Sequence, residues 1–206
     1  MAAGVRNRIQ KLHSRTLQSG FTLVETMISM VILTICSVGL LGVFGLAAKS
    51  NQMSQADLIA RQVASETIEG IYTARNTAEI SWSQIENVSN GGIFVDGMNT
   101  VMCAGPDGIL DTADDVACLT ASGATCPNGG MKCLTQPGPD GIMGTADDVI
   151  LSLNDYRRQV QIQPLIDTSG NPIQTLNLVT VTIQYRTPSS PAAKTYVINE
   201  YVSAYH

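Results

Sequence analysis

Two short acidic segments of this chain could bind a cation, because each gathers carboxylates around a tight turn. The segment at 105–116 reads Gly-Pro-Asp-Gly-Ile-Leu-Asp-Thr-Ala-Asp-Asp-Val, and ten of its twelve positions recur at 138–149. Calcium takes six to eight oxygen ligands from carboxylates and carbonyls in loops that contain glycine. We therefore expect Ca2+ at the carboxylates of Asp107, Asp111, Asp114, Asp115, Asp140, Asp147 and Asp148.

The same segments also have a purely structural interpretation as acidic hairpin tips. Pro-Asp-Gly favours a turn, because proline fixes φ and glycine tolerates positive φ. Thr-Ala-Asp-Asp can then start a short helical turn with threonine as its cap. Gly144 stands where the first copy has Asp111, so we expect weaker calcium binding in the second copy. The spacing differs from that of an EF-hand, and both interpretations stay open.

Four of the five cysteines lie in the same part of the chain as the acidic repeats. An even number of cysteines in an oxidising compartment predicts disulfides, and four cysteines allow three connectivities. We favour pairing between nearest neighbours, so that the first bridge brackets the first acidic segment. The expected pairs are Cys103–Cys118 and Cys126–Cys133.

Catalysis and zinc binding are not indicated. Histidine occurs only as His13 and His206, so no histidine is well placed as a general base or as a zinc ligand. No sequence feature indicates an organic cofactor. We expect that the protein is not an enzyme.

Glu25 is the only charged residue between Arg15 and Lys49. The run at 26–48 has no ionisable side chain other than that of Cys36. As a helix this run would be about 34 Å long, enough to cross a hydrocarbon core of about 30 Å. A carboxylate near the end of a membrane segment costs about 3 kcal/mol unless it is paired, so Glu25 indicates a function.

A basic leader precedes this run and predicts its orientation and processing. An ordinary secretory signal is cut after its apolar core, here near residues 45–47. The small residue Gly20 offers a cut before the run, which would leave the apolar helix at the new N-terminus. A signal peptide and a simple membrane anchor stay open, but neither accounts for Glu25. Positive charge stays on the cytoplasmic side, and the basic residues are Arg6, Arg8, Lys11 and Arg15.

Residues 20–25 read Gly-Phe-Thr-Leu-Val-Glu and stand directly before the apolar run. This motif resembles the cleavage and methylation motif of the type IV pilin and pseudopilin family. The apolar stretch at 31–42 ends in Gly-Leu-Leu-Gly and is most like the pilus modification class of minor pilins. The resemblance covers residues 15–76 and does not extend to the C-terminal part.

The resemblance implies how the N-terminus is processed and used. Prepilin peptidase would cut after Gly20 and methylate the new terminal residue, Phe21. Inside a filament, the free amine of Phe21 would pair with Glu25 of a neighbouring pilin. Opposite charges attract strongly where the dielectric constant is low, so this ion pair would stabilise the correct register between neighbouring subunits.

The remaining pattern predicts an α+β fold, in which a long N-terminal helix packs against an antiparallel meander. Apolar residues continue at helical spacing to residue 76. Alternating apolar and polar residues predict strands at 156–163, 179–185 and 194–203. The expected divisions are a leader at 1–20, a membrane or filament-core helix at 21–48, its amphipathic half at 49–76, and an exported head at 77–206, loop-rich at 87–150 and a meander at 151–206.

Charge limits the class of partner. The leader holds four of the twelve basic residues, which leaves eight against seventeen acidic residues and a net charge of −9 after cleavage. No basic patch is evident, so no nucleic acid is predicted. We expect a minor pilin of the bacterial inner membrane, with a cytoplasmic N-terminus and an exported head. It would later enter a pilus in the periplasm or at the cell surface. The alternatives are a minor pseudopilin of a type II secretion system and a calcium-dependent adhesion module at a fibre tip.

Overall fold

The computed structural model describes residues 20–120, 123–187 and 190–205. The basic residues of the expected leader lie outside these ranges. The chain divides into two compact units, Met1–Ala47 and Ala48–His206, and each is described here by itself.

In the first unit, the structure describes the N-terminal part of α1, a helix that runs from Leu23 to Asn76. The hydroxyl of Thr22 accepts the backbone N–H of Glu25 at 3.2 Å and so satisfies one of the free donors of the first turn. The large apolar side chains from Phe21 to Leu46 are exposed. By length and composition, α1 is the one helix among the described residues that could cross a membrane.

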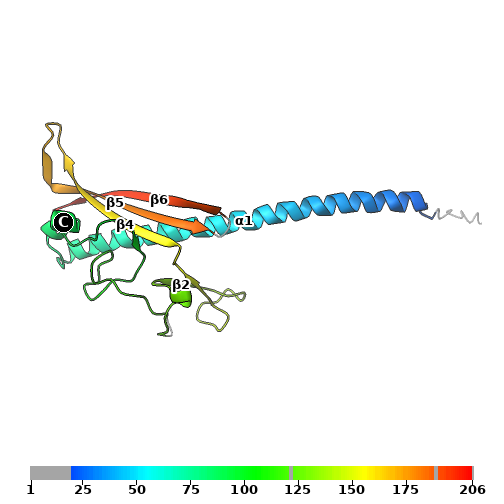
Figure 1. Ribbon diagram of the computed structural model, residues 1–206, viewed down its shortest axis with the longest axis horizontal. Coiled ribbons are helices and arrows are strands. Elements are labelled where there is room, and N and C mark those ends of the chain that lie inside the picture. Colours follow the sequence, from blue (N-terminus) through cyan, green and yellow to red (C-terminus); the bar gives the residue numbers. More distant parts are fainter. Residues whose placement is uncertain (1–19, 121–122, 188–189, 206) are drawn as a thin grey trace, which may run out of the picture. The chain divides into compact units, whose positions relative to one another are not determined.

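In the second unit, α1 buries one face against a sheet (Figure 1). The buried positions recur every three or four residues, which is the spacing of a single helix face. All of them are alanine or a β-branched residue, and the small alanine side chains let the helix approach the strands closely. They are Ala56, Ile59, Ala60, Val63, Ala64, Thr67, Ile68, Ile71 and Ala74.

The sheet confirms the predicted antiparallel meander. It contains β4 (Tyr156–Ile166), β5 (Pro172–Thr187) and β6 (Ser190–Ser203), and the short β1 (Asn99–Thr100) pairs with β4, so that the order is β1-β4-β5-β6. These strands extend beyond the predicted ranges of alternating apolar and polar residues, because the hydrogen bonding between strands continues toward the turns. Val160 lies opposite Val181, which lies opposite Ile198, so one face of the sheet supplies an apolar layer to the core.

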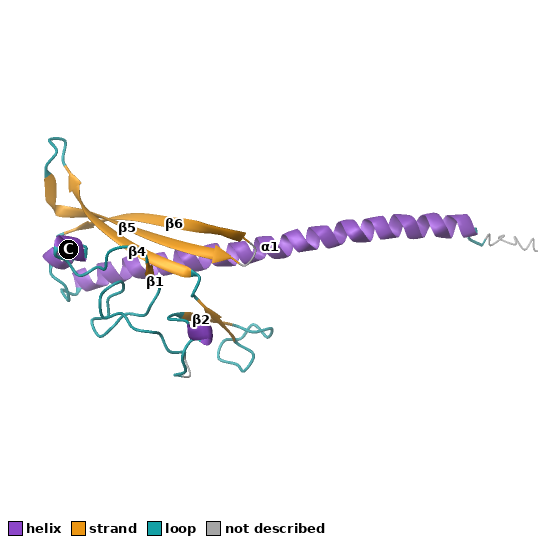
Figure 2. Ribbon diagram, viewed as in Figure 1, coloured by secondary structure: helices purple, strands orange, loops and turns teal. Residues whose placement is uncertain are grey.

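The segment between α1 and β4 is mostly loop, as expected, but it contains short elements that the sequence analysis did not predict (Figure 2). Runs of two to four residues are too short to show a period, so the pattern could not reveal them. These elements are β1 (Asn99–Thr100), the hairpin of β2 (Cys133–Gln136) and β3 (Val149–Ser152), and the 3-10 turns Trp82–Gln84, Val88–Asn90 and Pro127–Gly129.

Disulfides join the nearest neighbours in this segment, Cys103 to Cys118 and Cys126 to Cys133, as the sequence analysis expected. A salt bridge from Lys132 to Glu66 on α1 also fixes the loops to the helix. The two disulfides and this salt bridge therefore stabilise the segment between α1 and β4, which has few strands.

Candidate functional site

The N-terminal motif lies on an accessible part of the chain. Gly20 is exposed, and a Cβ added there would meet no atom within 4 Å. The side chain of Phe21 is 81% exposed. Glu25 lies in the first turn of α1, where a negative charge is favoured, and it forms no salt bridge with any residue that the structure describes. The motif is therefore open to an enzyme and to a partner chain.

Both acidic repeats form the tips of hairpins. The first tip is closed by an antiparallel bridge between Cys103 and Val116. The second is closed by the pairing of Gln136 with Val149, which is the pair of the β2–β3 hairpin next to the loop. These four residues occupy equivalent positions in the two copies. The duplicated sequence thus forms the same type of hairpin tip twice.

The threonine of each repeat binds a carboxylate of its own loop. The hydroxyl of Thr112 donates to Asp114 at 2.7 Å, and that of Thr145 donates to Asp147 at 2.6 Å. These hydrogen bonds hold the pKa values of Asp114 and Asp147 below their usual range. The expected helical turn capped by threonine is therefore wrong, because the hydroxyl is engaged by a carboxylate and the segment forms a turn without a helix.

The other carboxylates of the repeats accept backbone N–H groups, again in duplicate. Asp115 accepts the N–H of Asp111 at 2.9 Å, and Asp148 accepts that of Gly144 at 2.7 Å. Asp107 and Asp140 each accept the N–H group two residues further on. Much of the acidic character therefore stabilises the loops themselves.

The first glycine of each repeat is required by a close approach of the backbone. A Cβ at Gly105 would lie 2.2 Å from the carbonyl oxygen of Asp114, and one at Gly138 would lie 2.2 Å from that of Asp147. No side chain fits at such a distance. The seventh position of the repeat has left-handed backbone geometry in both copies, with φ of 70° at Asp111 and 87° at Gly144. Glycine adopts this conformation without strain, so the aspartate in the first copy calls for a compensating interaction.

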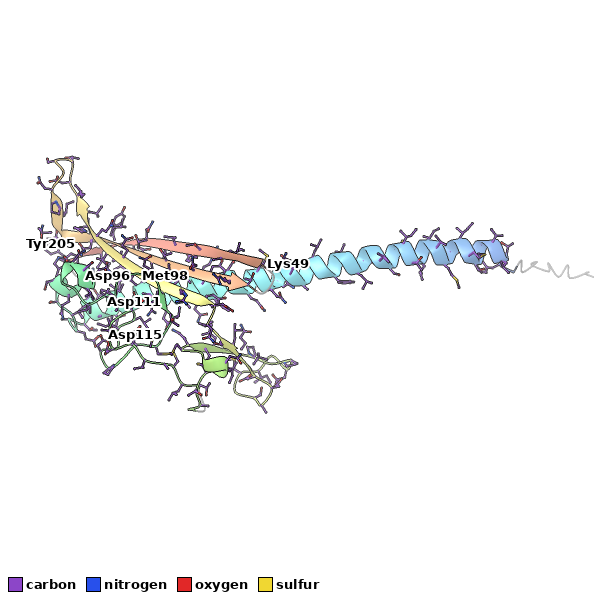
Figure 3. The ribbon with its side chains drawn as sticks, in the orientation of Figure 1. Lys49, Asp96, Met98, Asp111, Asp115 and Tyr205 are labelled. Atoms are coloured by element: carbon purple, nitrogen blue, oxygen red, sulfur yellow. A yellow bond between two sulfur atoms is a disulfide. The ribbon has the colours of Figure 1, made fainter. Side chains whose placement is uncertain are left out.

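Arg158 of β4 supplies that interaction. Its Nε donates to Asp111 at 3.3 Å, and its Nη2 donates to Asp115 at 2.8 Å. The second oxygen of Asp111 accepts the backbone N–H of Val160 at 3.2 Å. Arg158 is fully buried and Asp111 is 2% exposed, so the guanidinium depends on these two carboxylates for its counter-charge. Both acceptors, Asp111 and Asp115, are labelled in Figure 3. The cluster fixes the first repeat to the sheet.

The sequence analysis did not identify Arg158, although the strand pattern held a signal. Tyr156, Val160 and Ile162 lie on the core face of β4, and Arg158 lies on the same face between Tyr156 and Val160. An arginine at a core position requires carboxylate partners, because an unpaired buried charge is strongly disfavoured. Its Nη1 has no hydrogen-bond partner among the described residues.

Burial raises the pKa of Asp111 to about 6, and the repulsion of Asp115 adds to this effect against the attraction of Arg158. Arg158 lies closer to Asp115, so its charge is compensated mostly there. The folded state therefore holds a proton on Asp111 more tightly than the unfolded chain, whose value is 3.8. The contribution of Asp111 to stability is largest below pH 4 and is lost as the pH rises to about 6.

Comparison of the wild type with Asp111→Asn tests this pH dependence. Asparagine tolerates left-handed backbone geometry and does not ionise, so other carboxylates contribute equally to both proteins. We expect the wild type, relative to the variant, to lose about 2 to 3 kcal/mol of unfolding free energy between pH 4 and pH 7. Urea unfolding measured at several pH values checks this. A difference that does not change with pH would contradict it.

The expected calcium ligands do not converge in the structure. Within the described ranges, no three or more His, Cys, Asp or Glu side chains form a group that could hold a metal ion. Asp111 and Asp115 of the first loop already share Arg158. Calcium binding stays a prediction that would require these carboxylates to rearrange.

Comparison with known proteins bears on the N-terminal motif alone. Residues 15–41 match the family described as the prokaryotic N-terminal methylation motif. No curated protein and no solved structure matches the chain. The match confirms the resemblance that residues 20–25 indicated, and the roles of the individual residues stay predictions.

Proposed function

We propose that this chain is a minor type IV pilin-like subunit, which prepilin peptidase cleaves after Gly20 and methylates on Phe21. The motif at residues 15–41 is the prepilin signature of type IV pilins and pseudopilins, and it supports that class. The apolar helix that follows the motif is consistent with membrane anchoring and export. In this role the protein is a structural component of a fibre.

One observation carries the proposal: a carboxylate stands in an apolar helix surface that nothing in the described chain covers. The residues around Glu25 are exposed and apolar, among them Val24, Met27 and Ile28. Lipid can cover such a surface before assembly, and helices of neighbouring subunits can cover it in a fibre. Only the second arrangement supplies a partner for the charge, namely the free amine of a processed Phe21.

Glu25→Gln tests the role of the carboxylate, because it keeps the size of the side chain and removes the charge. We expect normal cleavage but poor entry into fibres. The loss of one partner from a buried ion pair costs about 3 kcal/mol or more, which corresponds to roughly a hundredfold loss of incorporation. Mass spectrometry of the N-terminus measures cleavage, and immunoblots of sheared fibres measure incorporation.

Glu69→Gln is the matched control, because Glu69 lies exposed on the second half of α1. It should enter fibres like the wild type. Full incorporation of Glu25→Gln would contradict the proposed pairing.

A minor pseudopilin of a type II secretion system is the alternative within the same signature. Deletion of the gene separates the two roles. Loss of surface pili with intact secretion supports the pilin, whereas loss of secretion with intact pili supports the pseudopilin.

A further inference from the structure

The face of the sheet that points away from the core has two neighbouring rows without a charged side chain. Successive side chains of a strand point to opposite faces. Val179 and Val181 of β5 are buried in the core, so Leu178 and Thr180 lie on the outer face. Across β4, β5 and β6, the two rows consist of Gln161, Thr180 and Asn199, and of Gln163, Leu178 and Tyr201. We call these six residues the neutral face.

The amide side chains of the neutral face are free to bind a ligand. Gln161, Gln163 and Asn199 are exposed, and their side chains form no hydrogen bond with any residue that the structure describes. Each amide presents two donors and one acceptor oxygen. Gln161 and Gln163 lie about 7 Å apart on the same face, because each residue of a strand adds about 3.4 Å. A single extended ligand can therefore reach both amides.

Apolar groups stand beside these amides. Tyr201 is 60% exposed, and Leu178 lies directly opposite it on the neighbouring strand. The face of an aromatic ring is negative and attracts the positive ends of C–H bonds. The neutral face therefore offers hydrogen bonds and apolar contact side by side, without charge.

A polar hollow of about 140 Å³ borders the neutral face along β4. Gln161 and Gln163 line one side of it, and Ser89 and Asp96 line the other. The carboxylate of Asp96 already accepts the backbone N–H and the hydroxyl of Ser89, each at 2.9 Å. The negative charge of this hollow is therefore satisfied by its own chain, and the site does not require a cation.

We propose that the neutral face binds an extended, neutral polysaccharide. A sugar ring brings hydroxyl groups, which donate and accept hydrogen bonds, and an apolar face of C–H groups, but no charge. The amides would bind the hydroxyls, and the ring of Tyr201 would stack on the apolar face of one sugar.

Other classes of partner match the neutral face less well. Nucleic acids and acidic polysaccharides require cationic side chains, and none of the six residues is lysine or arginine. Protein interfaces are enriched in aromatic residues, methionine and arginine, and Tyr201 is the single residue of these types among the six. The absence of charge therefore favours the neutral polysaccharide.

Titration of the full-length, isotope-labelled chain with neutral hexasaccharides tests the site. The probes are cellohexaose, maltohexaose and hexa-N-acetylchitohexaose, in micelles of dodecylphosphocholine, because detergents with sugar headgroups would compete. We expect at least one probe to give saturable shifts of the side-chain NH2 signals of Gln161, Gln163 and Asn199. Glucose at the same concentration should not, because a single ring cannot span both rows.

Two pairs of variants locate the binding. Tyr201→Ala should weaken hexasaccharide binding about tenfold, because it removes the stacking ring. Tyr205→Ala is the matched control, because Tyr205 is 72% exposed and lies beyond the end of β6. Gln161→Ala should weaken binding about fivefold through the loss of one amide. Gln55→Ala, at an exposed position of α1, should keep the wild-type affinity.

Three results would overturn the proposal. One is the absence of saturable shifts with every hexasaccharide in a protein whose spectrum shows it to be folded. Another is equal affinity of the wild type, Tyr201→Ala and Gln161→Ala. The third is movement of the same NH2 signals with protein concentration alone, which would make the neutral face a contact between copies of the chain.

The titration separates this proposal from the proposed pilin role. It needs no fibre, so its failure would leave the pilin role standing. Failure of the pilin role would leave the neutral face unaffected.

Discussion

Gly20→Arg leaves the chain in the membrane as an uncleaved, full-length precursor. The position has open space around it, so the substitution disturbs no packing in the described chain. The substitution therefore acts on cleavage, because the active site of the peptidase must accommodate the residue that precedes the scissile bond. Each 1.4 kcal/mol lost from the transition state is a factor of about ten in rate, and exclusion of a long charged side chain amounts to roughly a thousandfold loss.

Mass spectrometry of the purified chain decides the outcome by the identity of its first residue. The wild type should begin at Phe21 with a methylated amine. Gly70→Arg makes the same substitution on α1 outside the motif, where a Cβ also meets nothing within 4 Å, and it should be processed normally. A wild-type chain that begins upstream of residue 20 or near residue 48 would contradict the prediction.

Arg158→Met destabilises the second unit by about 3 to 5 kcal/mol, because it leaves two buried carboxylates without their counter-ion. Domains of this size are stable by about 5 to 15 kcal/mol, so a large share of the stability is lost. Trp82 is the single tryptophan, and its indole N–H donates to the carbonyl of Gln174 at 2.7 Å. Its fluorescence during urea unfolding therefore reports on the packing of this unit.

Arg157→Met is the control for this experiment, because Arg157 is the next residue of β4 and is exposed. It should change the unfolding free energy by less than about 0.5 kcal/mol. When Asp111→Asn and Asp115→Asn are added to Arg158→Met, most of the lost stability should return, because no buried charge remains. Equal effects of Arg157→Met and Arg158→Met would contradict the assigned role of the cluster.

The sequence determined the parts of this protein that depend on local pattern. The motif at residues 20–25 and the uncharged run behind it identified the processing signal, since both are properties of contiguous residues. Alternation identified β4, β5 and β6, because each strand has one face toward the core. Close spacing of the cysteines favoured the two disulfides that the structure contains.

The tertiary structure decided what the acidic repeats do. Ten of twelve identical positions gave the two copies most of the same internal hydrogen bonds, and in sequence they differ mainly by Asp111 and Gly144. Only the folded chain brings Arg158, more than forty residues away along the sequence, against the carboxylates of the first copy. The energy of a buried charge depends on every group around it, and those groups come from distant segments, so no local pattern could reveal that a buried arginine of the sheet pairs with the carboxylates of the first repeat.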